Sequence, residues 1–203
     1  MKNAFDIVRD FEQAVAKYTG APYCVAVSSC TAAIFTCCMW ETYNGRKHLI
    51  YIPKKTYIGV AQSIINSGQL LRFRDEQWSG AYDINPIKVS DSAKRFTSNM
   101  YKGNDGWKIC TSHHWQKILS LGHGGCILHD NKEFDIWARK FRFDGRTEGI
   151  KASEDINPIR GYHLYLLPEL AAAGLVRLHH LPKHNPDLSN DDYPDLSQMD
   201  IFK

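Results

Sequence analysis

The spacing of apolar positions along the chain predicts alternating helices and strands. Residues 5–18 carry apolar side chains at intervals of three and four, as one face of an amphipathic helix requires, and Gly20 can end that helix. Further helices are predicted from Cys30 onward, behind the capping hydroxyls of residues 28–31, and over residues 57–66. Short apolar runs typical of buried strands lie at residues 23–27, 49–52 and 70–73. This alternation predicts an α/β fold with a largely parallel sheet.

The middle of the chain places polar residues where two predicted strands end. Residues 87–89 lead into Asp91, and residues 108–111 lead into Ser112. In α/β proteins ligands bind at the carboxyl ends of strands, so we expect a binding site at these two clusters. The remaining predicted elements are a strand at 126–128 and helices at 132–142 and 168–181.

Composition sets the class of protein. The chain has 203 residues, of which 43% are hydrophobic, and this is enough for one domain with a real core. From Pro182 the sequence becomes polar and rich in proline, so we predict a domain over residues 1–182 and an extended tail over residues 183–203. With 25 basic and 22 acidic residues and no long run of like charges, no nucleic-acid partner is expected. Without a leader pattern or an apolar segment of ~18 residues, we expect a cytoplasmic protein that does not bind membranes.

Cysteine and histidine residues do not form a metal-binding pattern. The six cysteines lie mostly inside apolar runs without a CxxC pair, so we expect buried, reduced thiols. Three adjacent pairs could suggest a metal site: His113–His114, His179–His180 and Cys37–Cys38. Neighbouring side chains usually diverge on helices and strands, and no HExxH spacing accompanies these pairs, so we expect no metal.

Three residues near the predicted strand ends can carry amine chemistry. Lys117 follows Ser112, and Asp91 ends the preceding predicted strand. A lysine that can form a Schiff base, an aspartate that can hold a pyridinium proton and a nearby hydroxyl are the parts that a pyridoxal phosphate site needs. Taken singly, such a lysine is usually a surface residue and such an aspartate an ordinary helix cap, so the combination carries the prediction.

Several short motifs, in order along the chain, resemble the DegT/DnrJ/StrS family of pyridoxal phosphate enzymes, which are mostly sugar aminotransferases. The opening helix and Tyr18-Thr19-Gly20-Ala21 are followed by residues 25–33, in which Cys30 replaces a glycine of the family pattern. The motifs that follow are Pro53 to Tyr57, Asp91-Ser92-Ala93, Ser112 to Lys117, Gly124-Gly125, Phe143 to Arg146, Gly161-Tyr162-His163 and Ala171 to Leu175. Each motif is weak alone, but their shared order over roughly residues 5–182 makes chance unlikely.

The resemblance implies a fold and an assembly. It implies the three-layer large domain of fold-type I pyridoxal phosphate transferases, trimmed by at least one crossover unit because Asp91 follows Tyr57 by only 34 positions. It also implies a shortened form without the small carboxyl-terminal domain of the family. A protomer of this kind is expected to form a homodimer with a shared active site, in which His163 stands where the family often has asparagine.

The resemblance also implies the roles of the site residues. Lys117 would attach the cofactor, and Asp91 would hold the proton on its pyridine nitrogen. The start of the helix at Cys30 and Thr31 would bind the phosphate with help from Ser112, and Tyr57 would stack on the ring. Lys94 stands where the family often has a glutamine near the phenolic oxygen of the cofactor.

The implied function is an aminotransferase that moves an amino group from an amino acid, with glutamate expected, to a keto sugar of a nucleotide sugar or a related small ketone. Such a reaction belongs to polysaccharide biosynthesis. Related sugar dehydratases place histidine at the lysine position, so Lys117 favours transamination. The alternative is a degenerate member of the same fold that acts as a cofactor-binding or assembly module without turnover.

Overall fold

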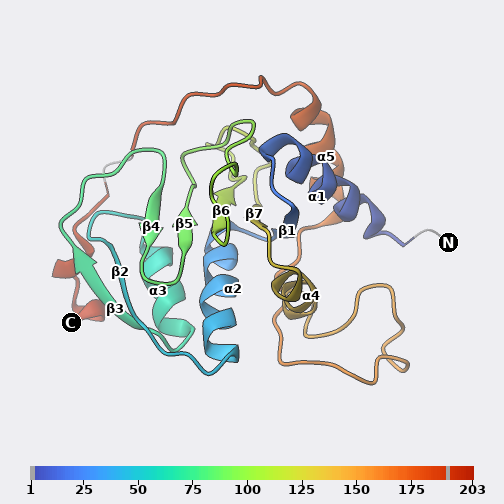
Figure 1. Cartoon of the computed structure of the whole chain (residues 1–203), viewed down its shortest axis with the longest axis horizontal. Helices are drawn as coiled ribbons and strands as arrows, with labels where there is room; N and C mark the ends of the chain where they lie inside the picture. The colour runs from blue at the N-terminus through green and yellow to red at the C-terminus, as the bar shows by residue number, and fades with distance from the viewer. Residues whose placement is uncertain (1–2, 191–192) are drawn as a thin grey trace.

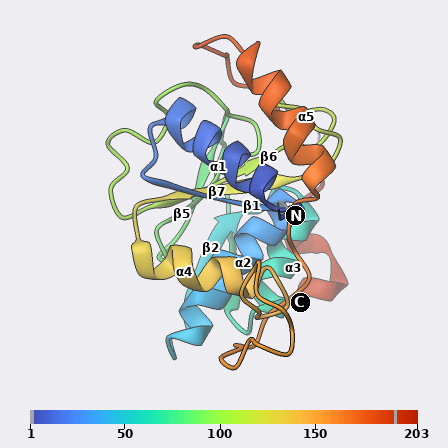
Figure 2. The ribbon, with the colours of Figure 1, turned by 90° about the vertical axis from the view of Figure 1, so that its right-hand side faces the viewer.

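The computed structural model describes residues 3–190 and 193–203, and its strands lie between two layers of helices (Figure 2). The helices are α1 (Asp6–Thr19), α2 (Cys30–Tyr43), α3 (Ile58–Asn66), α4 (Lys132–Phe141) and α5 (Pro168–His179). The strands are β1 (Tyr23–Val27), β2 (Leu49–Pro53), β3 (Leu70–Arg74), β4 (Tyr82–Ile84), β5 (Val89–Asp91), β6 (Lys108–Ser112) and β7 (Gly125–His129). The elements predicted from apolar spacing are therefore present, and β4 is an additional strand that this spacing did not predict.

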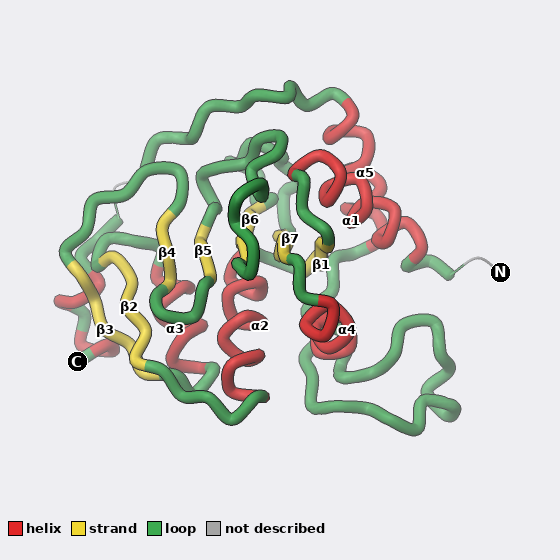
Figure 3. The backbone as a smooth tube through the Cα atoms, viewed as in Figure 1, coloured by secondary structure: helices red, strands yellow, loops and turns green. Residues whose placement is uncertain are grey.

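The strands cross the molecule in one continuous series. Five of them form a sheet in the order β1-β7-β6-β5-β4, and β2 and β3 form a separate parallel pair. The backbone N–H of Tyr51 in β2 donates to the carbonyl of Asn85, directly after β4, at 2.8 Å. This contact brings the pair alongside the larger sheet, as the row of strands in Figure 3 shows.

The expectation of a mostly parallel sheet is wrong. Strands β1 and β7, β6 and β7, and β4 and β5 pair antiparallel, whereas only β5 with β6 and β2 with β3 pair parallel. Antiparallel neighbours can be joined by a turn or loop, as β4 and β5 are, without a crossover helix. Apolar runs reveal that strands exist but not their direction, so the sequence pattern could not distinguish a mixed sheet from a parallel one. The predicted trimming by a crossover unit stays a prediction.

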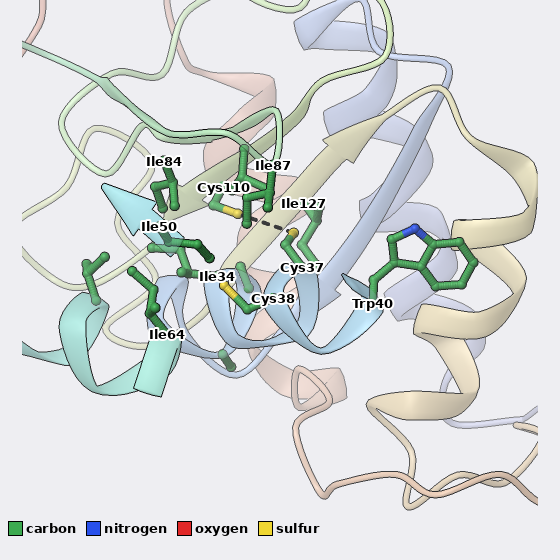
Figure 4. Packing of buried hydrophobic residues seen from close by; sticks show 14 of the residues in the cluster. Ile34, Cys37, Cys38, Trp40, Ile50, Ile64, Ile84, Ile87, Cys110 and Ile127 are labelled. Atoms are coloured by element: carbon green, nitrogen blue, oxygen red, sulfur yellow. Dashed lines mark hydrogen bonds between the residues drawn. The ribbon is translucent and has the colours of Figure 1, made fainter. Parts of the chain in front are cut away.

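Each face of the sheet is covered by its own helices and has its own apolar core. Helices α1 and α5 pack on one face, and α2, α3 and α4 pack on the other (Figure 2). Helix α2 is buried on most of its circumference because the sheet, α3 and α4 all contact it. In this core the thiols of Cys37 and Cys110 lie 3.7 Å apart as free cysteines (Figure 4). Among the described cysteines all six are free, and Cys30 is the one that is only half-buried.

The helix ends follow the sequence signals. Gly20 ends α1 in the left-handed conformation, with φ of 77°, and its N–H donates to the carbonyl of Ala16. The Ser29 hydroxyl accepts a hydrogen bond from the backbone N–H of Ala32 at 3.0 Å, so Ser29 is the N-cap of α2. Within residues 3–190 and 193–203, no helix has both the length and the apolar character needed to cross a bilayer.

Charged side chains satisfy the open edge of β1. Strand β1 pairs with β7 on one side, and its other side has no neighbouring strand along most of its length. There the N–H of Ala26 donates to Glu12 at 2.8 Å, and the carbonyl of Ala26 accepts from Arg142. The carbonyl of Cys24 accepts from Arg139 at 3.0 Å. These side chains make the hydrogen bonds that another strand would otherwise make.

The same residues form a buried ion-pair network. Glu12 is 2% exposed and pairs with both Arg139 and Arg142, and Arg142 also pairs with Glu148 at 2.8 Å. Burial alone would raise the pKa of Glu12, but the charges of Arg142 and Arg139 outweigh it and hold this pKa below its ordinary value. Helices α1 and α4 are therefore fixed to β1 through charges that stay ionised.

The segment after α5 returns across the molecule toward β3 (Figure 1). Asp187 accepts hydrogen bonds from Arg95, and the N–H of Leu196 donates to the carbonyl of Lys54 at 2.9 Å. Leu196 is fully buried, and two short 3-10 helices, Leu196–Gln198 and Asp200–Phe202, follow. Outside these two helices the described part of the segment forms no helix or strand, and it packs on the domain. The boundary at residue 182 stays a prediction.

Removing Glu12 should destabilise the protein strongly. Glu12→Ala removes one of the two carboxylates paired with buried Arg142, and it leaves the N–H of Ala26 without an acceptor, so we expect a loss of about 3–5 kcal/mol in the free energy of unfolding. Urea denaturation measures this loss. Glu154→Ala is the control, because its ion pair with Lys151 lies on the surface and should contribute little. Equal losses in the two variants would contradict the role of the network.

Candidate functional site

A cavity of about 450 Å³ lies between the start of α2, the end of β5, the loop between β6 and β7, and the returning carboxyl-terminal segment. This volume is within the range of small-molecule sites. Six of the seven site residues predicted from sequence line it: Cys30, Thr31, Tyr57, Asp91, Ser112 and Lys117. The fold thus brings together residues from four separate segments.

The start of α2 reaches the cavity because Gly125 has no side chain. A Cβ atom on Gly125 would lie 2.6 Å from the backbone nitrogen of Cys30, closer than real contacts allow. Ser29 and Gly124 form a parallel bridge at the same place, and Gly124 has a φ of 127°, which favours glycine. The Gly124–Gly125 pair therefore allows the helix start to pack directly on the sheet. The positive end of the helix dipole at Cys30 and Thr31 faces the cavity and favours an anion there.

Asp91 is a buried carboxylate at the end of β5. It is 5% exposed, and one carboxylate oxygen, Oδ1, accepts from the N–H of Ala93 at 3.0 Å and lies 3.8 Å from the Cys30 thiol. The other, Oδ2, accepts from the hydroxyl of Tyr82 at 2.9 Å. Burial raises the pKa of Asp91 above its ordinary value, and the two hydrogen bonds and the charge of Lys117 counteract part of this rise.

Lys117 lies in the loop that joins β6 to β7. Its backbone N–H donates to the carbonyl of His114 at 2.9 Å, and its side chain is half-buried and lines the cavity. Its positive charge lowers the pKa values of both Asp91 and Cys30, although burial keeps the Cys30 pKa well above its ordinary value. An amine beside a buried carboxylate is an arrangement that can hold and move protons.

His113 anchors the loop that carries Lys117. Its side chain is fully buried, with Nδ1 3.2 Å from the carbonyl of Leu119 and Nε2 3.2 Å from the thiol of Cys126. The ring also packs edge-on against Phe11 and Phe96. His113 is therefore a structural residue that fixes the loop, while His114, its neighbour in sequence, lines the cavity.

The other predicted residues occupy different positions around the site. Tyr57 is 56% exposed at the start of α3, and Ser112 is half-buried at the end of β6. Lys94 is buried and is not among the cavity-lining residues in the described part of the chain. Its backbone instead joins the carboxyl-terminal segment, where the N–H of Leu188 donates to its carbonyl at 2.9 Å.

Sequence reasoning missed aromatic and hydroxyl residues at the site. Thr56, Trp78 and Tyr193 line the cavity, and Trp78 packs against the ring of Tyr82 at a centroid distance of 4.8 Å. Residues 82–84 alternate buried, exposed, buried, and this period of two was the available signal for a strand. Tyr193 is an aromatic in a polar segment, and no local pattern connects it to the cavity. His123, which also lines the cavity, was missed as well.

His163, the residue considered for subunit contacts, is not among the residues that line the cavity. His163 is on the surface, where its Nδ1 lies 2.8 Å from a carboxylate oxygen of Asp144. In the described ranges, no three histidine, cysteine or acidic side chains gather so as to hold a metal ion.

Comparison with known proteins relates the chain to one enzyme family. Residues 2–101 match the sequence profile of the DegT/DnrJ/EryC1/StrS aminotransferase family, which confirms the resemblance seen in the motifs. The chain is 29% identical over 125 residues to the spore coat polysaccharide biosynthesis protein SpsC of Bacillus subtilis. That match covers 61% of this chain and 31% of SpsC, so the chain spans about a third of this relative.

Solved structures share the fold. The sugar aminotransferase CalS13 of Micromonospora echinospora matches 86% of this chain and 60% of its own length, with a TM-score of 0.69 and 18% identity. NtdA of Bacillus subtilis, solved with the cofactor PMP bound, matches 86% of this chain and 48% of its own length, with a TM-score of 0.67 and 19% identity. These likenesses support an α/β fold with a mixed sheet, as in pyridoxal phosphate-dependent aminotransferases.

Removing the cap of α2 should affect both stability and ligand binding. Ser29→Ala loses the hydrogen bond to Ala32 and should lower the free energy of unfolding by about 1 kcal/mol. Because this helix start faces the cavity, affinity for pyridoxal phosphate should also fall severalfold, as measured by absorbance titration. Asn131→Ala is the matched control, since Asn131 caps α4 through Phe134 at 2.9 Å, away from the cavity. That variant should lose similar stability and keep its affinity. If the affinity of Asn131→Ala for pyridoxal phosphate fell as well, the assignment of the phosphate to the start of α2 would be contradicted.

Proposed function

Because this chain is a relative of the DegT/DnrJ/EryC1/StrS aminotransferase family, we propose that it takes part in pyridoxal phosphate-dependent amino transfer to a sugar. One observation carries the proposal. Asp91 ends β5 and Lys117 lies in the loop that joins β6 to β7, yet both residues line the same cavity. A lysine, a buried carboxylate and a helix start that line one cavity are the groups that this chemistry requires.

The residues present fit pyridoxal phosphate. The phosphate matches the start of α2, where Cys30 and Thr31 line the cavity and Ser112 adds a hydroxyl from the facing strand end. Lys117 is the residue that would bond to the aldehyde, Asp91 would hold the ring nitrogen, and the exposed ring of Tyr57 could stack on the cofactor. Lys94 is not among the residues that line the cavity, so we assign it no contact with the cofactor.

The chain's own residues hold, orient and shield the reacting groups. When bound, the cofactor supplies an electron sink for the carbon that exchanges the amino group. Asp91, ionised, would hold a proton on the ring nitrogen, and Lys117, once the donor amine has replaced it at the aldehyde, would accept and return the proton at the reacting carbon. Buried surroundings strengthen the interaction of these charges because little water screens them.

The proposed substrates are an amino acid donor, expected to be glutamate, and a keto sugar of a nucleotide sugar or a related small ketone. The relation to a polysaccharide biosynthesis protein supports a sugar acceptor. Trp78 and Tyr193 line the cavity with aromatic surface, which suits the apolar faces of a sugar ring. We propose that the reaction serves polysaccharide synthesis in the cytoplasm.

We further propose a homodimer with a shared site. Ile150 and Ile156 are 41% and 83% exposed in the loop that follows Gly145, and Tyr162 is 40% exposed beside it. Exposed apolar side chains of this size favour burial against a second copy, and a symmetric dimer is the commonest homo-oligomer.

A cofactor-binding module without turnover is the second candidate, and Cys30 favours it. Its thiol stands where the family pattern has glycine, and it lies 3.8 Å from Asp91 Oδ1 in the cavity lining. A side chain there could compete for the carboxylate. Adding glutamate to the cofactor-loaded protein separates the two functions. An aminotransferase should convert the cofactor to its amine form with a change in visible absorbance, and a binding module should leave the spectrum unchanged.

Lys117→Ala should abolish covalent attachment of the cofactor and keep the fold. The change removes the only amine assigned to this bond and little packing. Borohydride reduction followed by mass spectrometry measures the attachment. Lys102→Ala, at an exposed position in another loop, is the control and should label like the unmodified protein. A reduced adduct that persists in Lys117→Ala would refute the assignment.

Asp91→Asn should still bind the cofactor but transfer the amino group slowly. The amide keeps the size of the side chain and loses the negative charge, so the half-reaction with glutamate should slow by on the order of 10²-fold, as when one electrostatic group is removed from an active site. Stopped-flow absorbance measures the rate. An unchanged rate would show that Asp91 does not act on the ring nitrogen.

A further inference from the structure

The hydroxyl of Tyr82 lies between Asp91 and Thr56. It donates to Asp91 Oδ2 at 2.9 Å and lies 2.7 Å from the hydroxyl of Thr56. Tyr82 is 4% exposed and Thr56 is 1% exposed, so water does not compete for these contacts. The three side chains form a buried chain of hydrogen bonds that ends on the carboxylate.

The protonation state of Asp91 determines which group is the donor in each of these hydrogen bonds. The N–H of Ala93 can only donate, so Oδ1 of Asp91 is an acceptor, and a proton on the carboxyl group is best placed on Oδ2. Tyr82 has a single proton. If it donates this proton to an ionised Asp91, Thr56 must donate to Tyr82; if Asp91 is protonated, both bonds reverse. Tyr82 therefore contacts Oδ2, the oxygen of Asp91 that gains or loses the proton.

We propose that Tyr82 is a positioning residue that keeps Asp91 ionised and fixed in orientation, and that Thr56 orients the hydroxyl of Tyr82. The use of this carboxylate for a cofactor rests on the proposed function. The effect of Tyr82 on the proton affinity of Asp91 is independent of the proposed function, because it follows from contacts within the protein.

The fold fixes all three residues. Tyr82 in β4 is directly opposite Asp91 in β5, and Trp78 packs edge-on against the Tyr82 ring. Thr56 follows β2, which is bonded to the residue after β4 through Tyr51. The hydroxyl is thus held by backbone pairing and ring packing, so little entropy is lost when it bonds to the carboxylate.

Tyr82 is one of four groups that oppose the effect of burial on Asp91. Burial raises the pKa of Asp91, and the opposing influences are the N–H of Ala93, the hydroxyl of Tyr82, the charge of Lys117 and the thiol of Cys30. Burial and the charge of Asp91 raise the pKa of Tyr82 well above its ordinary value, so it remains a proton donor at neutral pH. Removing this donor shifts the balance toward protonated Asp91.

The test measures the proton affinity of Asp91 in the protein without added cofactor. Carboxyl carbon NMR follows the titration of Asp91 in the unmodified protein and in Tyr82→Phe, which removes one hydroxyl and keeps the packed ring. We expect the pKa of Asp91 to rise by about one unit, a tenfold change in proton affinity, on loss of one hydrogen bond to the charged form. Tyr101→Phe is the control, because it loses a buried hydroxyl bonded to the carbonyl of Trp107 at 3.0 Å, and it should leave Asp91 unchanged.

Two changes at Thr56 test the second contact independently of the folding of Tyr82→Phe. Thr56→Val keeps the shape but lacks the hydroxyl, so it should raise the pKa of Asp91 by a smaller amount. Thr56→Ser keeps the hydroxyl and should restore the original titration. A purely structural role would lower stability in both Thr56 variants without this difference in titration.

The outcomes separate this inference from the proposed function. An unchanged titration of Asp91 in folded Tyr82→Phe and Thr56→Val overturns the inference, whatever the cofactor does. If the titration shifts and the unmodified protein binds pyridoxal phosphate, the acid limb of the pH profile for the glutamate half-reaction should move to higher pH in Tyr82→Phe. If the titration shifts but no cofactor binds, the proposed function fails and the control of Asp91 by Tyr82 stands.

Discussion

The open edge of β1 is the constraint on which the arrangement of this molecule depends. A strand at the edge of a sheet presents N–H and carbonyl groups that must be satisfied, and here Glu12, Arg139 and Arg142 make those hydrogen bonds. Because Glu12 comes from α1 and the arginines come from the end of α4, the same contacts fix helices on both faces of the sheet. The position of β1 in turn fixes the turn that leads into α2, whose start faces the cavity.

The two buried carboxylates, Glu12 and Asp91, are surrounded by different kinds of groups. Glu12 is matched by arginine charges, and its pKa is held below the ordinary value despite burial. Asp91 is surrounded mainly by neutral donors, with Lys117 as the nearby charge, and its pKa is raised. A fully compensated charge stabilises a structure, whereas a partly compensated charge can still respond to a ligand with a positive charge of its own. The contrast in pKa distinguishes the structural carboxylate from the one suited to chemistry.

Much of the fold and part of the site could be predicted from the sequence, for local reasons. Helix α1 follows from apolar spacing and Gly20, and the start of α2 follows from the Ser29 cap, because both signals act over a few residues. The direction of strands and the existence of β4 depend on long-range pairing, which a short apolar run does not encode. Lys117 and Asp91 were identifiable by residue type at strand ends. Tyr82 and Tyr193 were not, since their contact with the site depends on segments far apart in the chain.

The burial of Leu196 has a consequence for how the protein is made. Its N–H bonds to the carbonyl of Lys54, and Tyr193, three positions earlier, lines the cavity. The hydrogen bond between Leu196 and Lys54 joins parts of the chain that are 142 positions apart. Contacts of such separation form late, because loop closure over a long stretch costs entropy before it is rewarded. During synthesis the helices and most strands can assemble first, and the cavity gains its last wall only after residue 196 has left the ribosome.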